Sequence, residues 1–141
     1  MAEARTSNAY RFKEGDSRSI CCKVIEGTTD LDCGLMNFQT IDIPEGVTSI
    51  DFYRCANLVN VTVPSTVTEL QPACFTSCTS LTYVRMLPTT PPTLVKMIQS
   101  DPYNHFNNSN NCPIYVPAES LTAYQTAPGW SNYASRIQVE S

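Results

Sequence analysis

Charged residues are scarce in this chain, and positively charged ones are the scarcest. Of the 141 residues 16% are charged, and 9 Lys and Arg against 13 Asp and Glu give a net charge of −4. Without a basic run, the chain lacks the electrostatic pattern of a nucleic-acid-binding protein. No apolar stretch approaches the roughly 18 residues that a membrane-spanning helix requires. We therefore expect neither a nucleic-acid partner nor a membrane span, and 42% hydrophobic residues suffice for one domain with a core.

Residues that commonly carry out catalysis are also few. The single histidine, His105, lies in an Asn-rich stretch with no acid or nucleophile at a recognisable spacing. A cysteine paired with His105 across the fold is conceivable but disfavoured, because cysteine recurs here for reasons of the repeat described below. No phosphate-binding loop, serine-hydrolase elbow or zinc-protease motif occurs. We predict no enzyme, no catalytic residue and no cofactor.

Cysteine itself is abundant, with seven residues, but no C-x-x-C pair occurs among them. Zinc ribbons and redox sites need that close pair, because two thiolates must reach one ion or each other. We therefore expect no metal site. Cys55 and Cys78 are interpreted as small buried thiols that pack as hydrophobic residues, and the adjacent Cys21 and Cys22 as residues on opposite faces of a strand. The sequence leaves open whether any cysteines pair.

An internal repeat predicts most of the fold. The units begin at Phe38, Leu58 and Leu81 and share the pattern L-x-x-I-x-I-P-x-x-V-x-x-I, then a connector, then F-x-x-C-x-x-L. Two units are complete. They differ in length only through the connector, which has one residue between Ile50 and Phe52 and a longer run in the second unit.

Each unit predicts one coil of a solenoid. Alternating β-branched residues, such as Ile41 with Ile43, are typical of a half-buried strand. The proline that follows ends the strand, because it has no N–H to continue the ladder. The chain then places a second apolar pair, such as Val47 and Ile50, on an opposing face. Since one coil cannot bury its apolar face alone, we predict a stacked α/β-type solenoid, mostly β, with parallel strands in a right-handed coil.

The carboxyl-terminal part predicts one more strand and a helical cap. Ile114 and Val116 supply the strand, which Pro117 ends, and residues 118–126 are predicted as a short helix. After the helix break at Pro128 and Gly129 come three apolar residues at about helical spacing, which are Trp130, Tyr133 and Ile137. We interpret Trp130 and Tyr133 as the seal over the open end of the core.

Three parts of the chain follow from this pattern. Residues 1–36 are predicted as an amino-terminal arm and cap, with a strand over 19–25, a turn over 27–30, and about 15 initial residues that order against an assembly partner. Residues 37–117 hold the repeats, with a loop insertion over 88–111. Within it we predict a short helix over 94–100 and an exposed, mobile Asn-rich loop over 104–111. Residues 118–141 form the carboxyl-terminal helical cap.

These motifs resemble the BspA-type leucine-rich repeat found on surface proteins of host-associated anaerobic bacteria. The resemblance covers residues 38–137 and includes the I-Y-V-P and W-x-x-Y-x-x-x-I runs of the tail, which are similar to the segment that closes such arrays. The chain departs from the pattern in its short first connector, and in the third strand, whose Pro88 comes one place late. The resemblance implies a short leucine-rich-repeat array that serves as a non-catalytic binding module.

In a solenoid of parallel strands, the outward residues of successive coils align across one face. We predict this ladder as the ligand-binding surface, because tyrosines, one charge of each sign, hydroxyls and an amide make an adaptable contact face. The central row is Asp42, Thr62, Arg85 and Tyr115, and the flanking row is Thr40, Asn60 and Tyr83.

Two functions stay open at this point. The resemblance implies recognition of a protein or glycan ligand, or adhesion, at a bacterial cell surface, with the chain as a mature extracellular fragment. The alternative is a decoration or fibre protein of a bacteriophage virion, attached through residues 1–36 and possible as an oligomer. The polar residues 1–8 have no secretory-signal core, which favours the virion, whereas the habitat of the family favours the cell surface.

Overall fold

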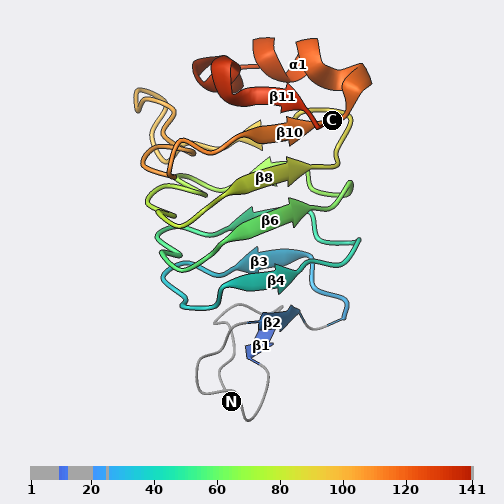
Figure 1. The fold of residues 1–141 in the computed structure, drawn as a ribbon, viewed down its shortest axis with the longest axis vertical. Coiled ribbons are helices and arrows are strands. Elements are labelled where there is room, and N and C mark those ends of the chain that lie inside the picture. Colours follow the sequence, from blue (N-terminus) through green and yellow to red (C-terminus); the bar gives the residue numbers. More distant parts are fainter. Residues whose placement is uncertain (1–9, 13–20, 25, 141) are drawn as a thin grey trace.

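The computed structural model describes residues 10–12, 21–24 and 26–140. Coils of the chain stack along its long axis, and helices close the carboxyl-terminal end (Figure 1). Each complete coil gives one strand to each of two opposite faces, because two apolar stretches recur in every repeat, and the described strands form three sheets in all. The predicted solenoid of parallel strands with short carboxyl-terminal helices is confirmed.

The first sheet carries the strand that opens each repeat. Val61 lies opposite Val84, Val84 opposite Ile114, and Ile114 opposite Ile137, and all these pairings are parallel. The predicted rungs of the ladder are therefore adjacent. In order, the strands are β11 (Ile137–Val139), β10 (Ile114–Val116), β8 (Tyr83–Met86) and β6 (Asn60–Val63).

Strand β4 (Thr40–Asp42) continues this face toward the amino-terminal end (Figure 1). The N–H of Val59 donates to the carbonyl of Gln39 at 2.8 Å, which joins this coil to the next. On its other side β4 pairs in parallel with β2 (Cys21–Val24), which pairs antiparallel with β1 (Tyr10–Phe12).

The amino-terminal predictions are tested only in part. The strand expected over 19–25 is confirmed over its described residues, 21–24. The expected turn ends before Asp30, because that residue already begins strand β3 (Asp30–Asp32). Residues 10–12 of the predicted arm pair within the chain as β1, and the rest of the arm lies outside the described residues.

The second sheet faces the first across the core. Its strands are all parallel, and Leu31, Ile50, Leu70 and Leu94 stand opposite one another along it. These four side chains are at most 4% exposed, so they form one wall of the core. The strands are β3 (Asp30–Asp32), β5 (Ser49–Asp51), β7 (Glu69–Leu70) and β9 (Thr93–Leu94).

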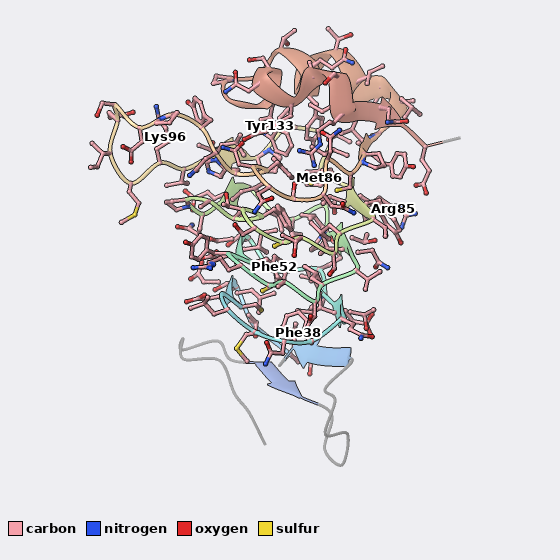
Figure 2. All side chains as sticks on the ribbon, turned by 60° about the vertical axis from the view of Figure 1, so that its left-hand side comes forward. Phe38, Phe52, Arg85, Met86, Lys96 and Tyr133 are labelled. Carbon is pink, nitrogen blue, oxygen red and sulfur yellow. The ribbon has the colours of Figure 1, made fainter. Side chains whose placement is uncertain are left out.

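A column of phenylalanines runs through the stacked coils. The ring centroids of Phe52 and Phe75 are 5.6 Å apart, those of Phe75 and Phe106 are 5.3 Å apart, and both pairs are stacked. Phe38 meets Phe52 edge-on at 6.5 Å, and Figure 2 shows these two rings in the lower coils. All four rings are fully buried, so they couple successive coils.

The prediction of a loop insertion over 88–111 is wrong, because this segment forms another coil. Phe106, Ser109 and Cys112 repeat the spacing of Phe75, Cys78 and Leu81, and all are buried. The N–H of Phe75 donates to the carbonyl of His105 at 2.8 Å, as that of Phe52 does to the carbonyl of Cys74 at 2.9 Å.

The backbone repeats as well. The second residue after the phenylalanine has a positive φ in three coils, with values of 56° at Arg54, 62° at Ser77 and 56° at Asn108. The asparagines 107, 108, 110 and 111 are exposed, as predicted, but the loop is anchored by buried residues between them.

The helix predicted over 94–100 is also absent. Leu94 instead ends strand β9, where its side chain is 4% exposed and opposite Leu70. Its neighbours Met97 and Ile98 are 82% and 61% exposed, so they have no face to bury, and an amphipathic helix has nothing to pack against.

The carboxyl-terminal cap closes the core as predicted. The indole N–H of Trp130 donates to the carbonyl of Pro92 at 2.8 Å, and the rings of Trp130 and Tyr133 lie 5.3 Å and 5.2 Å from Phe106. Ile137 does not continue the helical spacing, because it begins β11. The helical elements are η1 (Ala118–Ser120), α1 (Leu121–Thr126) and η2 (Trp130–Arg136).

Candidate binding surface

The predicted ladder lies on one face of the solenoid, in the expected register. Thr62 stands opposite Arg85, Arg85 opposite Tyr115, and Asn60 opposite Tyr83. Thr40 and Asp42 lie on β4, the next strand along the face. All seven predicted residues are exposed or half-buried and alternate with buried ones. The structure thus brings them together as a surface, which we call the ladder face.

Arg85 is the centre of the contacts on this face. Its Nε donates to Oε1 of Glu140 at 2.7 Å and its Nη2 to Oε2 at 2.5 Å, while Nη1 donates to Oγ1 of Thr62 at 3.2 Å. The guanidinium lies 4.8 Å from the ring centroid of Tyr83. Its hydrogen bonds hold the pKa of the Glu140 carboxyl below the usual value and raise the pKa of Arg85 further above neutrality.

Two tyrosines lie beside Arg85. The ring centroids of Tyr83 and Tyr115 are 6.0 Å apart and the rings are tilted by 48°. Both are half-buried, so each ring has part of its surface available for contact. Figure 2 shows Arg85 on the opposite side of the molecule from the loop that carries Lys96.

A shallow depression of about 360 Å³ adjoins this cluster on the ladder face. Thr62 lines it and also accepts the hydrogen bond from Arg85, so the depression and the cluster are continuous. Its lining combines hydroxyl, amide, carboxylate and apolar side chains, which are Thr40, Ile41, Asp42, Ile43, Glu45, Asn60, Thr62, Pro64 and Leu87.

Sequence reasoning missed the strand that extends this face at the carboxyl-terminal end. Gln138 of β11 stands opposite Tyr115, and Glu140 reaches Arg85. The alternation of Ile137, Gln138 and Val139 matches that of 114–116 and was a usable signal. The contact with Glu140, 55 residues from Arg85, had no sequence signal.

A second hollow lies away from the ladder face, and no motif in the sequence pointed to it. It has a volume of about 610 Å³ and lies between the loop carrying Lys96 and Met97 and the turns that hold Tyr53 and Pro72. Lys96 is already engaged there, because its Nζ donates to the carbonyl of Gln99 at 2.8 Å and lies 4.4 Å from the ring of Tyr103.

The cysteines of the repeat have a structural role. The thiol of Cys55 donates to the carbonyl of Cys33 at 2.9 Å, and that of Cys78 donates to the carbonyl of Phe52 at 3.0 Å. Each thiol therefore adds a second hydrogen bond to a carbonyl of the preceding coil that already accepts a backbone N–H. Burial raises the pKa of both thiols to about 12, which leaves them protonated and unreactive at neutral pH. The interpretation of Cys55 and Cys78 as buried packing residues is confirmed.

The described part of the chain provides no constellation for metal binding or for a Cys–His pair. No group of three or more His, Cys, Asp or Glu side chains is placed to hold a metal ion among the described residues. His105 is 1% exposed, and its Nε2 lies 2.7 Å from the carbonyl of Val95 rather than against a thiol. In the same part of the chain, no helix has the length and apolar character to span a membrane.

Because of His105, we expect the protein to lose stability in mild acid. The Nδ1 of His105 is buried and has no hydrogen-bond partner among the residues that the structure describes, and burial lowers the pKa of the imidazole from 6.5. The unfolded chain therefore binds the proton more readily, so the free energy of unfolding falls as the pH drops below about 6.5. Urea titrations at pH 7.5 and pH 5.5 measure the loss. His105→Gln, which keeps a donor for Val95 but does not titrate, should reduce it, and equal losses in the two proteins would contradict the assignment.

Successive coils place parallel strands on two opposite faces of a shared core, and polar side chains recur regularly along one face. This architecture defines a leucine-rich-repeat solenoid, a class whose members generally serve as binding domains. The chain matches the family model described as BspA type leucine-rich repeat region, in six copies over residues 33–125, and it belongs to this family. The match begins at Cys33, five residues before the repeat that we predicted to start at Phe38. Repeats of this family are usually non-catalytic. A search of curated proteins finds no match to the chain.

Proposed function

We propose that the protein is a non-catalytic recognition module, which binds a protein or glycan ligand through the ladder face and acts in adhesion at a bacterial cell surface. The observation that carries the proposal is the cluster of Tyr83, Arg85 and Tyr115 beside a depression of about 360 Å³. Tyrosine and arginine are enriched at the energetic centres of interfaces, because they give large contact area and directed hydrogen bonds.

The arrangement of the fold supports the same face. Its side chains come from successive parallel strands that pack on the core. A ligand therefore meets a surface that is already ordered, and the protein loses little conformational entropy on binding. The inert thiols and the bonded His105 give no support to a catalytic role. Display at the cell surface rests on the resemblance to surface proteins of the family.

Replacing both Tyr83 and Tyr115 by alanine is expected to weaken ligand binding by at least tenfold with little change in the unfolding curve. The reason is that both rings contribute contact area on the surface and neither is in the core. The measurement compares wild type and variant on one printed array of glycans and of host extracellular-matrix proteins, followed by titration of each hit.

The control is Tyr53→Ala, which removes an equally large ring, 37% exposed, beside the second hollow. We expect that control to bind like the wild type. Equal binding by the double tyrosine variant would show that the ligand is held elsewhere and would end the proposal.

A further inference from the structure

We propose that Arg85 is a carboxylate-binding subsite, occupied by the protein's own Glu140 when no ligand is present, and that its ligand is a glycan carrying a single isolated carboxylate. This inference rests on the proposed function of the ladder face and specifies the ligand of that face. It follows from the contacts of Arg85, from the exposure of Glu140 and from the charges around the depression.

The guanidinium already holds a carboxylate in a two-pronged geometry. Nε and Nη2 of Arg85 each donate to one oxygen of Glu140, at 2.7 Å and 2.5 Å. This parallel pair of bonds is the arrangement in which arginine recognises carboxylates most selectively. Thr62 accepts from the third nitrogen, and the guanidinium carbon lies over the Tyr83 ring, so the donor fork has contacts on two sides.

Glu140 can be exchanged for a carboxylate from outside. The side chains of Arg85 and Glu140 are 32% and 45% exposed, and ion pairs in such solvent-accessible positions contribute little to stability. Glu140 follows the last strand, β11 (Ile137–Val139), so its displacement breaks no strand pairing. A ligand carboxylate would replace one charge-assisted pair with an equivalent one and add its remaining contacts to the face.

The surroundings favour a ligand with one negative charge. Glu45 lines the adjoining depression and its charged carboxylate accepts hydrogen bonds from Ser65, so a second carboxylate placed there would be repelled. The other lining groups include Asn60 and Thr62, whose amide and hydroxyl match the hydroxyls of a sugar. Tyr83 and Tyr115 provide apolar rings against which the C–H face of a pyranose can pack. An acidic peptide has less to gain, since it brings further charge and few hydroxyls.

The test uses sugars that differ only in that carboxylate. The probes are 3′-sialyllactose, a disaccharide ending in glucuronic acid, the methyl ester of each, and the peptide Ac-Gly-Glu-Gly-NH2. Binding is followed by titration in NMR, where the Nε–H signal of Arg85 reports directly on exchange of its carboxylate partner. The two acidic sugars distinguish a sialate from a uronate source.

We expect at least one acidic sugar to bind tenfold or more tightly than its ester and to shift the Nε–H signal of Arg85. Arg85→Gln should remove the preference for acid over ester. Glu140→Gln should raise the affinity for the acid by up to about fivefold, which is the fold-change that corresponds to the free energy of an exposed ion pair. Glu119→Gln, which removes an exposed acid from η1 in the cap, controls for the change in net charge and should leave the affinity unchanged.

Any one of three results would overturn the inference. These are equal affinity for acid and ester, tighter binding of the peptide than of the sugars, and weaker binding of the acid by the Glu140→Gln variant. These outcomes are separable from failure of the proposed function. If the array gives a ligand whose binding depends on Tyr83 and Tyr115 but not on a carboxylate, the ladder face binds and only its ligand class is wrong. Loss of the tyrosine dependence would remove both.

Discussion

Phe75→Ala is expected to lower the free energy of unfolding by about 3–5 kcal/mol, the usual cost of removing a buried phenylalanine side chain. Phe75 is fully buried and stacks on Phe52 on one side and on Phe106 on the other. Its loss leaves a cavity and also removes two ring–ring contacts, worth about 0.5–1.5 kcal/mol each. Because a repeat array is stabilised by the interfaces between neighbouring coils, the damage falls on three coils at once.

Chemical denaturation followed by circular dichroism measures this effect. Met97→Ala serves as the control, since its side chain is 82% exposed and surface substitutions usually change stability by less than about 0.5 kcal/mol. A loss below about 1.5 kcal/mol for Phe75→Ala would mean that the phenylalanine column does not hold the coils together as described.

Arg136→Met is expected to destabilise the protein by about 2–4 kcal/mol, because it removes three charge-assisted hydrogen bonds at a half-buried position. The guanidinium donates to the carbonyls of Cys112 at 2.8 Å and Phe106 at 3.0 Å, and to Oγ of Ser109 at 2.9 Å. Arg136 thereby ties the cap to the last coil. The carbonyl of Phe106 keeps its bond from Ser109 at 2.6 Å, so the main loss is at Cys112.

The same denaturation experiment tests Arg136, with two companion variants. Arg136→Lys should lose part of the stability, since an ammonium group cannot reproduce the three directions of the guanidinium fork. Arg54→Met is the matched control, because Arg54 is exposed and its guanidinium lies 6.0 Å from the ring of Tyr53. Similar small losses for Arg136→Met and Arg54→Met would contradict the role of Arg136 as a tie between cap and coil.

The strands of the first sheet were predictable because their signal is local. Val61 and Val63 alternate with polar residues within a few positions, and Pro64 marks the end of the strand. The same spacing in the next unit sets the register, which is why Thr62 and Arg85 stand opposite each other as predicted. The burial of Cys55 and Cys78 followed from the same reasoning.

The segment over 88–111 was misread because its repeat is degenerate. Ser109 stands where the other units have cysteine, Cys112 stands where they have leucine, and the long loop carrying Met97 interrupts the spacing. The core accepts these changes, since Ser109 is buried with its hydroxyl bonded to the carbonyl of Phe106. The stacking of Phe106 on Phe75 and the pairing of Leu94 with Leu70 identify the segment as a coil.

By itself, the amino-acid sequence determined the repeating coil, the two opposed apolar faces and the seven outward residues of the ladder. These depend on periodicity over short distances, where each side chain's direction follows from that of its neighbours. The tertiary structure alone decided that Arg136 joins the cap to the coil of Phe106 and Cys112, and that Glu140 binds Arg85. Such contacts join residues far apart in the chain, and their partners are selected by how the coils stack, which no local spacing encodes.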